Sequence, residues 1–161
     1  MNINPLDILI ITFLISTMLV GLNNKSIITL KKTFSIFLAL VLSNLITQNL
    51  SELILFLNTK TGIFYLITFL VILVLLSLII SFVIDIIIEQ SNEILIDEGL
   101  DKFLTLALGF IKGVIILVLI IFIFDTTPID KVNKEIIYKK VQNKSSLFQH
   151  LNNLKGILLK D

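Results

Sequence analysis

The chain has 161 residues, of which 56% are hydrophobic and 16% are charged, and its mean hydropathy is +1.02. This composition is too apolar for a soluble globular domain and predicts one compact helical membrane domain. The net charge of +1 argues against a nucleic-acid partner, and the absence of cysteine excludes disulfides and thiolate metal sites.

The first predicted span covers residues 5–22. Asn4 precedes it as a helix cap, and Pro5 occupies the first helical position. Asp7 lies in the first turn, where the helix dipole favours an anion. No basic residue precedes the apolar run and no clear cleavage site follows it, so the segment is expected to be a retained span and not a signal peptide.

The second predicted span covers residues 33–50 and is the least hydrophobic of the four. Asn44, Thr47 and Gln48 lie on one side of it. Two interpretations of this polar stripe remain open. It either lines a path for a small solute or fixes the order of the helices through interhelical hydrogen bonds.

The third predicted span, residues 62–88, carries a second polar stripe. Ser77, Ser81 and Asp85 follow one another at four-residue intervals. The loop after this span is short, so the third and fourth spans are expected to be antiparallel neighbours. That loop, residues 89–101, is acidic, but its spacing matches no calcium loop and no histidine is near. A solvated acidic turn is predicted in place of a metal site.

The fourth predicted span, residues 101–124, separates a polar face from an apolar one. At about 100° per residue, its polar and small residues share about one third of the helix circumference. These residues are Asp101, Lys102, Thr105, Gly109, Lys112 and Gly113. Gly109 and Gly113 form a G-x-x-x-G step, extended by Thr105, which allows the backbone of a second helix to approach closely.

Lys112 is the only charged residue between Phe103 and Phe124. A lysine near the bilayer centre costs about 3 kcal/mol and usually needs a partner. In an antiparallel hairpin its ammonium group would reach back toward Ser81 and Asp85 of the third span. The sequence therefore predicts an intramembrane polar pair between Lys112 and Asp85.

A lysine-rich tail, residues 128–161, follows the predicted membrane domain of residues 1–127. Thr127 and Pro128 repeat the cap and proline pattern of the N-terminus, so a helix is expected to begin near Pro128. Four leucines then recur at helical spacing, namely Leu147, Leu151, Leu154 and Leu158. This spacing predicts an amphipathic helix that lies on the membrane surface.

The fourth span resembles the signature of the colicin V production protein (CvpA) family, L-D-[RK]-x-L-G-x-x-x-G-x-x-[KR]-G. The matching residues are Leu100-Asp101-Lys102-Phe103-Leu104 and Gly109-Phe110-Ile111-Lys112-Gly113, with Thr105 where the family usually has a glycine. Members of that family are small bacterial inner-membrane proteins with four spanning helices. The resemblance therefore implies an all-α, multi-pass membrane protein over nearly the whole chain.

Three classes of function compete. The resemblance implies a non-enzymatic inner-membrane protein that helps colicin V (toxin) production or export and envelope maintenance. The alternative is a small channel or transporter subunit that uses the polar stripes of the third and fourth spans, although inverted repeats and broken helices are missing. An enzyme is not expected, because the spans hold no cysteine, no serine–histidine pair and no paired histidines.

The expected partners are the lipid bilayer and either other membrane or export proteins or further copies of this chain. No nucleic acid is expected among them. No catalytic residue, cofactor site or metal site is predicted.

Overall fold

The computed structural model describes residues 4–54, 62–89, 97–127, 131–142 and 145–159. All the regular elements in these ranges are α-helices: α1 (Pro5–Leu22), α2 (Ser26–Ile54), α3 (Gly62–Glu89), α4 (Glu98–Thr126), α5 (Lys131–Gln142) and α6 (Ser146–Leu159). The predicted all-α fold is therefore confirmed. The four helices α1 to α4 are long and apolar enough to cross a membrane.

The helix bounds differ most from the prediction at the start of α2. The lysines at 31 and 32 made this stretch resemble a loop, yet the helix already begins at Ser26. The backbone N–H of Ser26 donates a hydrogen bond of 3.0 Å to the Asp101 carboxylate, so an otherwise unpaired group at the helix start is satisfied by α4. In contrast, α1 has the predicted bounds, and the Asn4 side chain accepts from the N–H of Leu6 at 3.2 Å.

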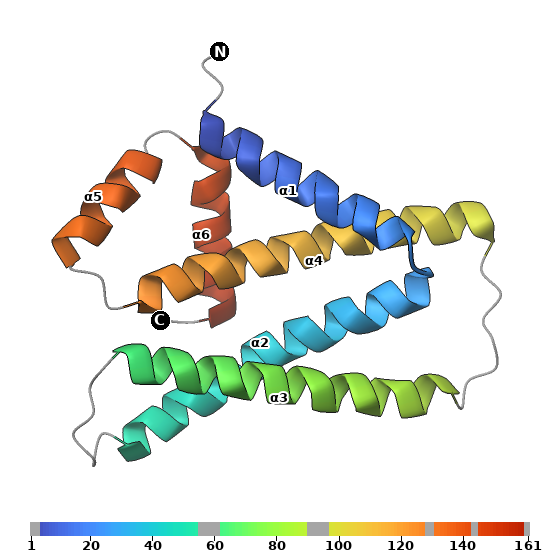
Figure 1. Cartoon of the computed structure of the whole chain (residues 1–161), viewed down its shortest axis with the longest axis horizontal. Coiled ribbons are helices and arrows are strands. Elements are labelled where there is room, and N and C mark those ends of the chain that lie inside the picture. Colours follow the sequence, from blue (N-terminus) through green and yellow to red (C-terminus); the bar gives the residue numbers. More distant parts are fainter. Residues whose placement is uncertain (1–3, 55–61, 90–96, 128–130, 143–144, 160–161) are drawn as a thin grey trace.

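The four long helices form two closely packed pairs, α1 with α4 and α2 with α3 (Figure 1). α2 also packs against α4, whereas α3 and α4 make only a minor contact. The expectation that the third and fourth spans are direct neighbours is therefore corrected: the main neighbours of α4 are α1 and α2. The bond between Ser26 and Asp101 joins the N-terminal ends of α2 and α4, so these two helices run in the same direction.

The core lies where α4 meets α2, α3 and α6. Leu40, Phe69 and Val118 have no exposed surface, and the rings of Phe69 and Phe122 have centroids 4.7 Å apart. By contrast, the outward faces of α1 and α3 are apolar and open, with Leu9 63% and Phe82 65% exposed. Surfaces of this kind on helices that could span a bilayer are suited to contact with lipid.

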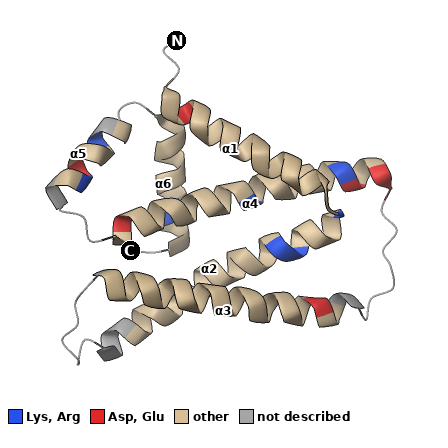
Figure 2. Ribbon diagram, viewed as in Figure 1, with Lys and Arg blue, Asp and Glu red and all other residues tan. Residues whose placement is uncertain are grey.

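Charged residues gather near the ends of the long helices and on α5, and much of α1, α3 and α4 carries none (Figure 2). The most apolar spans are α3 and α4, and Lys112 is the only charged residue of α4 between Phe103 and Phe124. Apolar runs of this length with so few charges are what a hydrocarbon core requires.

The tail forms two helices, α5 and α6, in place of the single surface helix that was expected. The expected start at Pro128 lies outside the described residues, and α5 begins at Lys131. α6 packs against α4 and also contacts α1 and α2. Leu151 and Leu159 are buried in the core, whereas Leu154 is 39% exposed, so α6 is part of the packed bundle. Leu147 and Leu158 are partly buried against the same core.

Candidate functional site: a lysine-lined pocket beside the contact of α1 with α4

α4 meets α1 through its face of small residues. A Cβ atom added to Gly109 would lie 2.9 Å from both the Cα atom of Met18 and the backbone oxygen of Thr17, which is closer than real Cβ atoms come. One turn further on, a Cβ atom at Gly113 would overlap the hydroxyl group of Thr17. The two helices therefore touch through their backbones, as G-x-x-x-G contacts do.

The same contact extends toward the N-terminal end of α4. Thr105 is 1% exposed, and its hydroxyl donates to the backbone oxygen of Asp101 at 2.7 Å. A Cβ atom at Gly21 of α1 would lie 3.1 Å from the Thr105 carbonyl oxygen. Positions 105, 109 and 113 thus form one continuous face against α1.

The charged residues of the same motif have separate places. Asp101 accepts hydrogen bonds from both the backbone N–H and the hydroxyl of Ser26, so it fastens the start of α2 to α4. Lys102 is exposed. Of the acidic loop, residues 90–96 lie outside the described residues, and Asp97 caps α4 by accepting from the N–H of Gly99 at 3.2 Å. Both carboxylates thus accept hydrogen bonds from backbone N–H groups at the first turns of helices.

A pocket of 230 Å³ lies between α1, α2 and α4, beside the glycine contact. Its volume is many times the roughly 10–15 Å³ that a cavity needs to hold one water molecule. Its polar lining consists of Ser16, Thr17, Asn24, Thr29, Lys32 and Lys112. The apolar lining includes Val20 and Ile116. Among the described residues that line this pocket none is a carboxylate, so its charge is that of two ammonium groups.

The pairing of Lys112 differs from the prediction. Asp85 forms an ion pair with Lys31 of α2, whereas Lys112 lies in the pocket formed with α1 and α2. Lys112 shares a helix face with Gly109 and Gly113, so docking of the glycines on α1 carries the lysine away from α3. The proposed pair of Lys112 with Asp85 is replaced by the pair of Lys31 with Asp85.

The polar stripe of α3 does not meet the small-residue face of α4. The Ser77 hydroxyl donates to the carbonyl of Val74 in its own helix at 2.9 Å, and Ser81 is half-buried. The stripe of α2, in contrast, faces protein. The buried Asn44 donates to the Leu159 carbonyl of α6 at 2.7 Å and accepts from the Tyr65 hydroxyl of α3 at 3.2 Å. Gln48 is half-buried on the same stripe.

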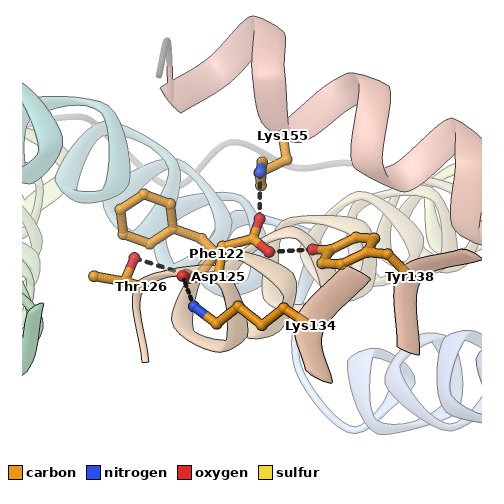
Figure 3. A network of polar contacts seen from close by, with 6 residues as sticks. All are labelled: Phe122, Asp125, Thr126, Lys134, Tyr138 and Lys155. Carbon is orange, nitrogen blue, oxygen red and sulfur yellow. Dashed lines mark hydrogen bonds and ion pairs between the residues drawn. The ribbon is translucent and has the colours of Figure 1, made fainter. Parts of the chain in front are cut away.

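Sequence reasoning missed a polar cluster at the C-terminal end of α4 (Figure 3). The carboxylate of Asp125 accepts from the Tyr138 hydroxyl of α5 and forms an ion pair with Lys155 of α6. The ammonium group of Lys134 donates to the Asp125 carbonyl. Lys155 is only 7% exposed. The sequence signal for this cluster was Lys155, which lies midway between Leu151 and Leu159 on the apolar side of α6. A charge in that position needs a carboxylate partner.

The hydrogen-bond donors that line the pocket are of the kinds that bind anions. Ammonium groups carry the positive charge, and the Asn24 amide can donate beside them. The hydroxyls of Ser16 and Thr17 instead donate to carbonyls of their own helix, each at 2.8 Å. The site is therefore basic, with its charge supplied by Lys32 and Lys112.

Comparison with known proteins agrees with the motif in α4. The sequence matches the family described as colicin V production protein over residues 6–156, which includes α1 to α4, the pocket and most of α6. Comparisons with curated proteins and with solved structures found no match. The family match extends far beyond the motif that suggested it and covers nearly the whole chain. The chain therefore belongs to the colicin V production protein family.

Proposed function

We propose that this protein is a non-enzymatic inner-membrane protein that helps a bacterium to produce or export a toxin of the colicin V type and to maintain its envelope. The observation that carries the proposal is the family match over residues 6–156, in a chain with four helices suited to crossing a membrane. A non-enzymatic role is supported by the pocket. Its Ser16 and Thr17 hydroxyls donate to carbonyls of α1, so neither donates to a base as an activated nucleophile does.

The proposal is tested in a colicin V-producing host that lacks the gene for this protein. The wild-type chain, restored in a single copy, should return both toxin secretion and exclusion of a membrane-impermeant dye. Gly109→Leu should fail, because leucine forces α4 away from α1. Ala107→Leu is the matched control, since Ala107 is exposed on the same helix. Unchanged secretion and dye exclusion after deletion would contradict the proposal.

A second candidate function is that of a small channel or transporter subunit. The polar stripes of the third and fourth spans, from which the sequence predicts this function, do not meet. The observation that now favours it is the basic pocket within candidate spans, between α1, α2 and α4. Flux of a small anion through liposomes that contain the purified chain, lost in Lys112→Ala and retained in Lys102→Ala, would support this function over the first.

A further inference from the structure

We propose that the pocket between α1, α2 and α4 binds the phosphate group of an anionic phospholipid. This ligand goes beyond the proposed function, which names no ligand. The proposal rests on three features of the described residues: two lysines in a pocket whose lining includes no carboxylate, the directions of those lysines, and the exposure of part of the lining.

The first observation concerns charge. In the described part of the chain, the two ion pairs join Lys31 to Asp85 and Lys155 to Asp125. Lys32 and Lys112 form neither, and they line one pocket without a carboxylate. Two like charges at the edge of a low-dielectric region repel each other and are costly to desolvate. An anion between them removes both costs.

The second observation concerns direction. The N-terminal ends of α2 and α4 are joined by the bond between Ser26 and Asp101. Because Cα–Cβ bonds tilt toward the N-terminus of a helix, the stems of Lys32 and Lys112 extend toward the same end of the bundle. The Cα atom of Lys112 lies about 13 Å further along α4 than that of Phe103, the first residue of the apolar run. The lysine stem points back toward Phe103 and is about 6 Å long, so the ammonium group lies closer to the start of the apolar run than the Cα atom does. Both ammonium groups therefore approach the membrane surface where headgroups lie.

The third observation concerns access. Val20 lines the pocket and is 61% exposed on the outward face of α1, and Lys32 is exposed as well. The lining thus reaches the outward face of α1 at Val20 and the connection between α1 and α2 at Asn24, so a lipid at the end of the bundle can reach the two lysines. Val20 and Ile116 offer apolar contacts to the carbon atoms next to a phosphate. Basic pockets between spanning helices bind anionic headgroups in this way. Inorganic phosphate offers the same chemistry, but the apolar contacts of Val20 and Ile116 favour the lipid.

The test measures thermal unfolding of the full chain in a neutral detergent. Phosphatidylglycerol, phosphatidylcholine and inorganic phosphate are titrated separately at matched ionic strength. The rise in Tm with phosphatidylglycerol gives an apparent affinity, because a ligand that binds only the folded state stabilises it. Lys32→Gln and Lys112→Gln should each weaken that affinity about fivefold, and the double variant about 25-fold. Lys102→Gln removes the same charge from an exposed position of α4 and should leave the affinity unchanged.

The outcomes separate the ligands. A larger rise with phosphatidylglycerol than with either other titrant, dependent on both pocket lysines, supports the lipid site. An equal rise with inorganic phosphate and the same lysine dependence would overturn the lipid as the source, though not the phosphate chemistry. Equal effects of the two lipids, or an equal loss in Lys102→Gln, would overturn the proposal entirely. If Lys112→Gln fails to fold, Lys32→Gln decides the matter, since Lys32 is exposed and its change leaves the packing intact.

Discussion

The same substitution, glycine to alanine, should have opposite effects at two helical positions of this chain. At Gly156 of α6, an added Cβ atom meets nothing within 4 Å. Gly156→Ala should therefore raise the free energy of unfolding by up to about 1 kcal/mol, the difference in helix propensity between the two residues. At Gly109 the same methyl group would lie 2.9 Å from backbone atoms of Thr17 and Met18, which cannot rotate away as a side chain could.

The expected cost at Gly109 follows from that overlap. Overpacking costs typically about 1–3 kcal/mol, and contact with backbone atoms places this site in the upper part of the range. After subtraction of the propensity gain of about 1 kcal/mol, Gly109→Ala should lower the free energy of unfolding by about 1–2 kcal/mol. The two variants should then differ by about 2–3 kcal/mol.

The assay is denaturant unfolding of both full-length variants and the wild type in the same detergent, followed by circular dichroism. Equal slopes with denaturant would show that the variants unfold from equally compact states, so that the midpoints report stability. Stabilisation of Gly109→Ala comparable to that of Gly156→Ala would refute the backbone contact between α1 and α4. It would also mean that packing of the α4 glycines on α1 does not determine the position of Lys112.

Two further predictions concern the ion pairs. Lys155→Met should lower the free energy of unfolding by about 2–3 kcal/mol, somewhat less than for a fully buried pair because Asp125 keeps its Tyr138 partner and the carboxylate is 24% exposed. Addition of Asp125→Asn to Lys155→Met should restore most of this loss, and a loss unaffected by the second change would argue against the pair. Asp85→Asn should cost less than Lys155→Met, because the Asp85 side chain is 49% exposed near the end of α3 and the Asp125 side chain only 24%. A larger loss in the same unfolding assay would mean that the pair of Asp85 with Lys31 is more shielded than the structure indicates.

The features that the sequence predicted well depend on neighbouring residues. The bounds of α1 follow from Asn4 and Pro5, which act within one turn of helix. The small-residue face of α4 follows from the spacing of Thr105, Gly109 and Gly113. The start of α2 could not be predicted in this way, because the group that caps Ser26 comes from α4, 75 residues further along the chain.

The choice of neighbours was also beyond local reasoning. Chain order suggested α3 as the partner of α4, since a short loop joins them. The shapes of the surfaces decided otherwise: Gly109 and Gly113 fit the backbone of α1. The position of Lys112 follows from this contact, because Lys112 lies on the same face of α4 as the two glycines. Likewise, the position of Lys155 on the apolar side of α6 marks a need for a carboxylate, but not that Asp125 would supply it.

The bond between Asn44 and the Leu159 carbonyl has a consequence for the biogenesis of the protein. It ties the second membrane helix to the last residue of α6, and α6 follows all four spans in the sequence. A ribosome therefore completes α2 long before the group that pairs with Asn44 exists. Until then the buried amide must be hydrated or borrow another acceptor, since an unpaired amide in an apolar interior is costly. The side of the bundle that α6 covers is thus the last to close during synthesis.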